Sequence, residues 1–368
     1  FIGKISYSVY LWHWPIVVAE NYYEKAAQPV WIAGGILASF VFGYLSWKFV
    51  ELRTQGKAAP SHAFLPSVPL PVTLAFALLV FVGGGAIYYR QGVPERFDHS
   101  VFVADEETYD TNPHRSVCHM LMDPCDVYKT QLASRAVILG DSHADALAEA
   151  VNAAVPNGKR GDVILIAVQG CPTIDGVRRD NGECFEANRK YIHLLGKQSS
   201  KSPPVIIVNH WSEYMSGESA SKLSFSDTNQ AGYKGEPFSA DQYRRRFLST
   251  MCGLAKTRPV YLVQPVPEFD VNVPNTLARE KLANPGAPDL TLDMAEYYKR
   301  NARVLKLLRE ARDQCGVQLL DPTPYLCPQG KCLGSYQGRP LYSDRHHMSE
   351  YGNRFLVPMF KQVFALSQ

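Results

Sequence analysis

The sequence predicts an α/β domain built on a parallel sheet and preceded by about three transmembrane helices. Long apolar runs are confined to the first 90 residues, whereas short β-branched runs alternate with amphipathic segments from residue 136 onward. Such alternation is typical of a parallel sheet with helices on both faces. The 368 residues allow two or more domains. The net charge of +3 is too small to indicate nucleic-acid binding.

Three apolar segments, at residues 5–19, 30–50 and 72–89, carry the membrane prediction. The second and third have about the 20 residues that a spanning helix needs. Buried core helices of a soluble fold are the alternative, but runs this long and free of charge are rare there. The first segment has neither a basic leader nor a small-residue cleavage site, so we do not interpret it as a signal peptide. We expect the chain to be part of a longer membrane protein.

The charges between the apolar segments predict their orientation. Lys48, Arg53 and Lys57 flank the second connection, whereas the first carries two acidic residues and one basic residue. Basic loops favour the cytoplasmic side of a membrane. Three spans would therefore place everything after Arg90 in a periplasm-like compartment.

All eight cysteines follow Arg90, and an even number in an exported domain indicates disulfides. Eight cysteines allow 105 pairings, so the connectivity stays open. A zinc site at Cys327 and Cys332 is the alternative, but no second pair of ligands at finger spacing follows them. The pairs that we expect are Cys118 with Cys125, Cys171 with Cys184, Cys252 with Cys315, and Cys327 with Cys332.

Residues 91–131 are polar and contain three prolines, and we interpret them as a linker or an extension packed on the domain. Strands and helices alternate after it. The expected strands are 137–139, 163–168, 205–208, 260–263 and 317–320. The expected helices are 144–154, 185–198, 241–256, 292–314 and 349–365, the last with Ser349 as its N-cap. The connection 265–292 either borders a groove or is plain surface.

Ser142 is the candidate nucleophile. It follows the first predicted strand in Gly140-Asp141-Ser142-His143 and opens a helix. Open α/β sheets bind ligands outside the carboxyl ends of their strands. The free N–H groups at the start of that helix can stabilise an oxyanion. A serine in such a position is also commonly a cap or a turn residue, so this motif alone is weak.

A serine hydroxyl needs a base within hydrogen-bonding distance before it attacks a carbonyl. We expect His347 to be that base and Asp344 to orient its second ring nitrogen. His346 is the competing base. The combination with Ser142, near the two ends of one α/β domain, is more specific than either motif alone.

Together, Gly140-Asp141-Ser142-His143 and Asp344-x-x-His347 resemble the SGNH (GDSL-like) hydrolase superfamily. The resemblance implies a three-layer SGNH-type domain over residues 132–368, with Ser142, Asp344 and His347 as catalytic residues. It also implies an oxyanion hole formed by the N–H groups of Ser142 and Gly170 and the side chain of Asn209. A turn glycine at 170 and a loop-capping amide at 209 are the alternatives.

Residues 6–15, with the sequence Ser-Tyr-Ser-Val-Tyr-Leu-Trp-His-Trp-Pro, resemble the late-helix signature of acyltransferase family 3 membrane proteins. Residues 49–53 resemble the motif that closes that domain, although a proline often found there is missing. The resemblance makes residues 1–53 the last helices of that domain, 54–90 a loop and a linking transmembrane helix, and 91–131 a periplasmic linker. The family's early helices would lie outside this chain. We interpret His13 as a structural residue at the membrane interface.

Family members of this kind resemble bacterial O-antigen and peptidoglycan O-acetyltransferases. The resemblance implies transfer of an acyl group, taken to be acetyl, to a cell-envelope polysaccharide through an acyl-enzyme on Ser142. Acetyl-CoA would be the ultimate donor through the membrane domain, with no metal and no bound cofactor in the exported domain. The expected partners are the envelope glycan, the lipid bilayer and the remaining family-3 helices. The expected location is the bacterial inner membrane, with the C-terminal domain in the periplasm.

Two other functions stay open. One is an exported SGNH carbohydrate esterase with the same three residues, because water or a sugar hydroxyl can attack the same acyl-serine. The other is a non-catalytic, membrane-anchored glycan-binding module. The intact set of serine, aspartate and histidine argues against the latter. The acceptor sugar and the oligomeric state cannot be derived from the sequence.

Overall fold

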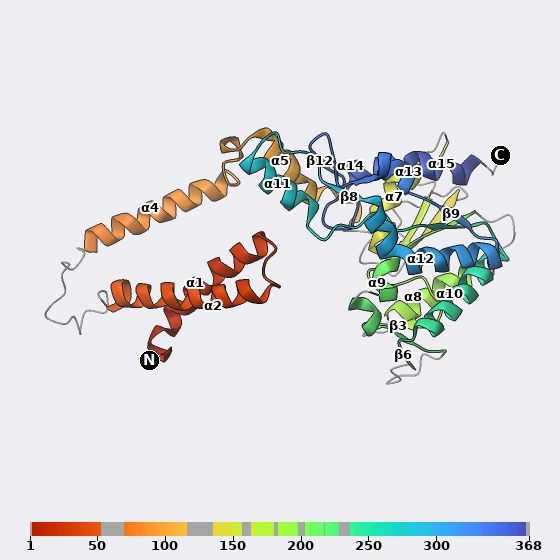
Figure 1. The fold of residues 1–368 in the computed structure, drawn as a ribbon, viewed down its shortest axis with the longest axis horizontal. Helices are drawn as coiled ribbons and strands as arrows, with labels where there is room; N and C mark the ends of the chain where they lie inside the picture. The colour runs from red at the N-terminus through yellow and green to blue at the C-terminus, as the bar shows by residue number, and fades with distance from the viewer. Residues whose placement is uncertain are drawn as a thin grey trace. The chain divides into compact units, whose positions relative to one another are not determined.

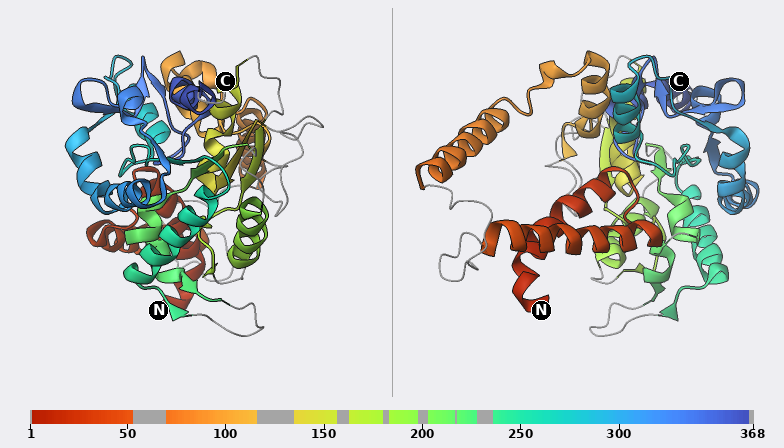
Figure 2. Two further views of the ribbon diagram at one scale, coloured as in Figure 1. Left: turned by 90° about the vertical axis from the view of Figure 1, so that its right-hand side faces the viewer. Right: turned by 60° about the vertical axis from the view of Figure 1, so that its left-hand side comes forward.

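The computed structural model describes residues 2–52, 70–115, 135–156, 163–179, 183–197, 203–216, 218–227 and 236–365. The chain divides into two compact units, Phe1–Arg96 and Phe97–Gln368. Figure 1 shows both units as ribbons, and Figure 2 shows them from two further sides.

The first unit is helical. It contains α1 (Ile2–Tyr22), α2 (Pro29–Ser46), a π-helical turn at Trp47–Glu51 and α4 (Leu70–Tyr89). Helices α1 and α2 pack side by side (Figure 1). Their backbones approach closely at Gly43, where a Cβ atom would lie 2.9 Å from the Cα of Val9. Small residues permit this kind of close helix contact within membranes.

Two helices in the described part of the chain are long and apolar enough to cross a membrane, Pro29–Glu51 and Pro71–Tyr89. About three spans were expected, and two helices of the described residues qualify. Helix α1 has sufficient length, but Lys4, His13 and Glu20, together with several Ser and Tyr residues, reduce its apolar character.

The second unit is built on a parallel five-stranded sheet with the order β2-β1-β4-β7-β9. Gly140 pairs with Ala167 on one side and with Val208 on the other. The carboxyl ends of the three strands on this side of the sheet therefore meet beside Gly140. The strands are β1 (Ala136–Gly140), β2 (Val163–Ala167), β4 (Val205–Val208), β7 (Val260–Val263) and β9 (Gln318–Leu320).

Helices cover both faces of this sheet and give the expected three-layer arrangement (Figure 1). Side chains of successive strand residues point to opposite faces. Ala136 and Ile138 accordingly pack in a core with α7 and α15, whereas Val137 and Leu139 pack in a second core with α8, α10 and α12. These helices are α7 (Ser142–Ala154), α8 (Glu183–Gly196), α10 (Ala240–Ala255), α12 (Met294–Cys315) and α15 (Val357–Ala365).

Short elements connect these layers. The small antiparallel sheets are β3 (Val177–Arg178) with β5 (Ser224–Phe225) and β6 (Glu236–Pro237), β8 (Thr291–Asp293) with β10 (Lys331–Leu333), and β11 (Ser335–Tyr336) with β12 (Arg339–Pro340). The remaining helices of the second unit are α5 (His99–Glu106), α9 (Trp211–Ser216), α11 (Val273–Ala283), α13 (Thr323–Leu326) and α14 (Glu350–Asn353).

The expected single C-terminal helix is wrong in one respect, because the structure interrupts it. Ser349 caps α14, and its Oγ accepts a hydrogen bond from Gly352 N at 3.0 Å. A 3₁₀ turn at Arg354–Leu356 follows, and α15 then begins at Val357. Pro358 is the second residue of α15, where a missing N–H costs nothing because it has no intrahelical acceptor. The proline therefore favours a new helix start at this point.

The segment expected to be an irregular linker or an extension packed on the domain contains a helix, α5, that belongs to the second unit. Asp98 caps α5 by accepting a hydrogen bond from Ser100 N at 2.9 Å. Ala104 of α5 packs against Leu277 and Ala278 of α11. Residues 116–131 of this segment lie outside the described residues.

Three of the four expected disulfides are present: Cys171–Cys184, Cys252–Cys315 and Cys327–Cys332. The described cysteines are therefore not available as zinc ligands. Cys118 and Cys125 lie outside the described residues. The Cys252–Cys315 bridge joins α10 to the end of α12 across 63 residues, whereas Cys327–Cys332 closes only five.

We predict that the longer bridge stabilises the domain more. Loop-closure entropy gives about 4 kcal/mol for the 63-residue bridge and about 2 kcal/mol for the five-residue bridge. The double serine variant at Cys252 and Cys315 should therefore lose about 2 kcal/mol more unfolding free energy than that at Cys327 and Cys332. Proteolysis of the unfolded fraction across a urea series measures both. Equal losses, or the reverse order, would contradict this ranking.

Glu350 generates a second stability prediction. Its Oε1 atom is buried without a hydrogen bond to any described residue. Burial raises the Glu350 pKa to about 7, and the nearby Glu149 and Asp110 act in the same direction. A pKa that is higher in the folded state means that stability is lost as the pH rises from about 4.5 to 7.

Glu350→Gln removes this titration. Relative to the wild type, the variant should gain about 1–2 kcal/mol of unfolding free energy between pH 5 and pH 8. Amide hydrogen exchange of peptides from β1 and β4 in the detergent-solubilised chain measures this gain. Glu280→Gln, at an exposed position on α11, is the matched control. A Glu350→Gln difference that does not change with pH would refute the assignment.

Candidate active site

The nucleophile position is produced by a tight strand-to-helix turn. Strand β1 ends at Gly140, Asp141 caps α7 and Ser142 is the first residue of that helix. A side chain at 140 has no space, because a Cβ atom would lie 1.7 Å from the carbonyl oxygen of Val208. The turn leaves Ser142 half-buried at the carboxyl edge of the sheet.

The buried carboxylate of Asp141 holds this turn against the neighbouring strand. Its Oδ1 accepts a hydrogen bond from His143 N at 2.9 Å. Its Oδ2 accepts from His210 N at 2.8 Å and from the Tyr214 hydroxyl at 2.7 Å. Burial, followed by the charge of Asp141, raises the pKa of Tyr214 well above its usual value, so this hydroxyl stays a donor.

The structure brings Ser142, His347 and Asp344 together in one hydrogen-bonded chain. His347 Nε2 lies 2.8 Å from Ser142 Oγ, and His347 Nδ1 lies 2.6 Å from Asp344 Oδ2. Burial alone would raise the pKa of Asp344, but the hydrogen bond from His347 and the charge of that ring outweigh it and hold the pKa well below its usual range. This arrangement can remove a proton from the serine hydroxyl and stabilise the resulting imidazolium.

The turn at residues 344–347 is fixed by its own backbone and by the connection after β7. Asp344 Oδ1 accepts hydrogen bonds from His346 N and His347 N, each at 2.8 Å. Phe269 N donates to the carbonyl oxygen of Arg345 at 2.9 Å. The connection 265–292 therefore borders the site, which is the first of the two alternatives expected from the sequence.

No hydrogen bond joins His346 to Ser142. Its Nδ1 atom lies 3.1 Å from Nε2 of the buried His143. Burial, and then the neighbouring His347, lower the pKa of His346 to about 4, so this ring is neutral at pH 7. The geometry thus gives His347, rather than His346, access to the serine.

An ion pair that the sequence did not predict lies on the same cleft. His210 Nε2 lies 3.4 Å from Glu268 Oε2, and Ser212 Oγ donates to Glu268 Oε1 at 2.5 Å. Burial opposes protonation of His210, but Glu268 outweighs it and raises the His210 pKa. His210 and Glu268 both follow the carboxyl ends of strands, β4 and β7, which is the one signal that points to them.

Three imidazoles of the site lie close enough together to be considered as metal ligands, and the expected absence of a metal stays a prediction. Possible ligand atoms of His143, His210 and His346 lie within 4.8 Å of one another. However, the rings of His143 and His346 are parallel to within 6°, and their facing nitrogens share a hydrogen bond. In the neighbouring group, Nδ1 of His347 is engaged by Asp344. Nε2 of His143, Nδ1 of His346 and Nδ1 of His347 are thus hydrogen-bonded in this structure.

Gly170 lies in the turn that follows β2, at a positive φ of 66° that favours glycine. Ser142 and Gly170 both line a cleft of about 480 Å³. The backbone N–H groups of these two residues donate no hydrogen bond to another described residue. Both groups are therefore available to a ligand.

Asn209 is oriented differently from the expectation. Its Oδ1 accepts a hydrogen bond from Thr173 N at 3.1 Å, and its Nδ2 donates to the carbonyl oxygen of Cys171 at 3.4 Å. The side chain is buried and does not line the cleft with Ser142. Asn209 thus supports the loop after Gly170, and its place in an oxyanion hole stays a prediction.

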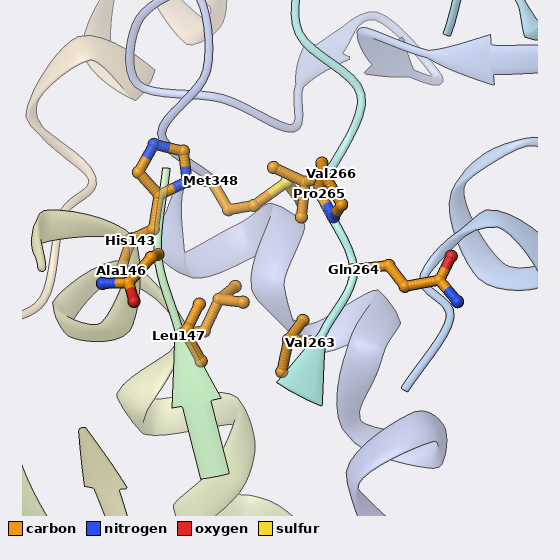
Figure 3. Close-up of a pocket in the computed structure, with 10 residues that line it drawn as sticks. His143, Ala146, Leu147, Val263, Gln264, Pro265, Val266 and Met348 are labelled. Carbon is orange, nitrogen blue, oxygen red and sulfur yellow. The ribbon is translucent and has the colours of Figure 1, made fainter. Parts of the chain in front are cut away.

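A second, small space lies between the ends of β4 and β7 and helix α7 (Figure 3). Leu147 and Val263 face each other across it, and His143 and Met348 also contribute to its wall (Figure 3). Its volume of about 10 Å³ has room for one water molecule at most. The open cleft that Ser142 lines is therefore much the larger of these two spaces.

Comparison with known proteins gives a family match over most of the second unit. A family model described as an SGNH domain, fused to AT3 domains, matches residues 108–362. The O-acetyltransferase OatA of Staphylococcus aureus strain NCTC 8325 is 42% identical over 67 residues, which are 18% of this chain and 11% of OatA. The chain therefore spans only about a tenth of that relative's length.

Two solved structures have weaker likenesses. The periplasmic domain of the lipopolysaccharide acetyltransferase of Salmonella ser. Paratyphi A is 15% identical, with a TM-score of 0.48 over 72% of this chain and 97% of that chain. The aryl esterase of M. smegmatis is 14% identical, with a TM-score of 0.36 over 64% of this chain and 100% of that chain. With TM-scores this low, neither structure indicates an activity.

The geometry predicts different effects of alanine at the two adjacent histidines. His347→Ala removes the only described base in contact with Ser142 Oγ, so hydrolysis of p-nitrophenyl acetate should fall about 10³-fold. His346→Ala should cost less than about tenfold, because a base that stays in contact with the serine retains most of its effect. Circular dichroism checks that both variants fold. A greater loss at His346 would mean that the base is assigned wrongly.

Proposed function

Because this chain belongs to the family of SGNH domains that are fused to AT3 domains, we propose that it transfers an acetyl group to a hydroxyl of a cell-envelope glycan. The observation that carries the proposal is the hydrogen-bonded chain from Ser142 through His347 to Asp344. The match to a protein named as an O-acetyltransferase supports acetyl as the transferred group.

Acylation begins when Ser142 Oγ attacks the carbonyl carbon of the donor. His347 Nε2, at 2.8 Å, accepts the serine proton, and Asp344 stabilises the imidazolium. The tetrahedral intermediate then collapses, the bond to the leaving group breaks, and His347 returns the proton to that group. The product is an acetyl ester on Ser142.

Transfer repeats these steps with the glycan. A sugar hydroxyl attacks the acetyl carbon and gives its proton to His347, and the bond to Ser142 Oγ breaks as the proton passes to the serine. The free N–H groups of Ser142 and Gly170 would hold the negative oxygen in both steps. In the resemblance, Asn209 is the third donor, a role that its present hydrogen bonds do not support.

The proposal includes an organisation for the whole chain. Residues 1–53 would be the last helices of an AT3 domain, 54–90 a loop and linking helix, 91–131 a linker, and 132–368 the catalytic domain. The complete membrane domain would bring acetyl groups from cytoplasmic acetyl-CoA across the bilayer. The three disulfides support a location in an oxidising compartment, the periplasm side of the inner membrane.

Hydrolysis is the second candidate, favoured by the openness of the cleft. Ser142 is half-buried in a cleft of about 480 Å³, which water can enter. A bound sugar hydroxyl nevertheless reacts ahead of water when it is held near the acyl carbon, because positioning can give an effective molarity of about 10⁵ M. The two functions therefore differ in whether the cleft binds an acceptor.

This difference predicts how the products change when a glycan is added. The detergent-solubilised chain is incubated with p-nitrophenyl acetate and with peptidoglycan or O-antigen oligosaccharides, and mass spectrometry measures acetylated sugar against acetate. An acceptor should divert acetyl to the sugar. Ser142→Ala should reduce both products about 10⁴-fold or more, because it removes the nucleophile.

Ser249→Ala, at an exposed position on α10, is the matched control and should behave like the wild type. Acetate as the sole product with every acceptor, together with loss of acetyl from envelope glycans exposed to the full-length protein, would favour the esterase. Undiminished activity of Ser142→Ala would refute both enzymatic functions.

A further inference from the structure

Arg179 holds the turn that carries Gly170. Its Nη1 atom donates a hydrogen bond to the carbonyl oxygen of Gly170 at 3.0 Å. A Cβ atom at Gly170 would lie 1.8 Å from the same nitrogen. The guanidinium therefore rests directly on the glycine backbone, and it lines the cleft together with Ser142.

Within the described part of the chain, Arg179 forms no ion pair with a carboxylate, and Glu213 and Glu268 are the acidic residues that line the same cleft. Arg179 is half-buried, and its single hydrogen bond within the described part of the chain goes to a neutral carbonyl. Five other arginines of the domain have carboxylate partners, whereas Arg345, which lines the same cleft, has none among the described residues; the five are Arg244, Arg246, Arg300, Arg312 and Arg339. A planar guanidinium with free N–H groups is suited to a negatively charged oxygen.

Two neutral polar side chains described near Gly170 are already hydrogen-bonded within the protein and do not stabilise an oxyanion. The Tyr214 hydroxyl is committed to Asp141, and the Asn209 amide is committed to Thr173 and Cys171. The free N–H groups of Ser142 and Gly170 are dipoles without net charge. An oxyanion in a tetrahedral intermediate carries a full negative charge, and loss of one stabilising group commonly costs 10²–10³-fold in rate, about the range seen for hydrogen-bond donors.

We propose that Arg179 is a positioning residue of the oxyanion hole: it fixes the Gly170 turn through the carbonyl oxygen and supplies positive charge beside the developing oxyanion. The inference rests on the proposed acyl transfer through Ser142 and adds a residue that the resemblance does not include. Arg179 acts through Gly170 and through its electric field, so its effect belongs to the transition state rather than to ground-state binding.

The test compares Arg179→Met and Arg179→Lys in the full chain with p-nitrophenyl acetate. Arg179→Met should lower kcat about 10²-fold and change KM less than about threefold. Arg179→Lys keeps the charge but not the fork, so its loss should be smaller. Added guanidinium at millimolar concentration should restore Arg179→Met at least about tenfold, because it can occupy the vacated position.

Arg178→Met is the matched control. Arg178 is the adjacent residue, and its guanidinium lies 5.2 Å from the centre of the Phe185 ring, away from the residues that line the cleft. Its variant should retain wild-type kcat and should not respond to guanidinium. Amide exchange of β2 and β3 peptides reports whether any variant has lost local structure.

Wild-type kcat in Arg179→Met would overturn this inference and leave the proposed function intact if Ser142→Ala is inactive. Equal losses in both Arg179 variants, no rescue by guanidinium and faster amide exchange would mean a merely structural role and would also overturn it. Full activity of Ser142→Ala, in contrast, would reject the proposed function itself.

Discussion

The site depends on the buried carboxylate of Asp141. Three donors meet it: the N–H of His143 in the first turn of helix α7, the N–H of His210 after β4, and the hydroxyl of Tyr214 on α9. A buried carboxylate is stable only when its oxygens are hydrogen-bonded. The same three bonds connect the nucleophile turn to the neighbouring strand, so satisfying this one group also fixes the orientation of Ser142.

A second set of constraints brings the far end of the chain to this turn. Asp344 accepts the N–H groups of two consecutive histidines, and the loop after β7 donates to the backbone of Arg345. His347 is consequently held by backbone bonds as well as by its ring. Loops that carry reacting groups are usually positioned by a rigid scaffold, and here the scaffold is the edge at which the parallel strands end.

The sequence was sufficient for features that leave a local pattern. Apolar runs located the five parallel strands to within about one residue, and the serine and histidine paired from their motifs lie 2.8 Å apart in the structure. The sequence was insufficient where two interacting residues are far apart in the chain and belong to no motif, as for His210 and Glu268. The break before Pro358 and the orientation of the Asn209 amide likewise depend on tertiary packing, which periodicity does not report.

The alternation of side chains in β1 has a consequence for how variation acts on this protein. Ala136 and Ile138 belong to one core and Val137 and Leu139 to the other, so a shift of one residue would exchange the two sets between unlike environments. Packing on both faces thus fixes the position of the strand, and Ser142 lies two residues beyond its end. A core substitution that displaced this strand would therefore also displace the nucleophile.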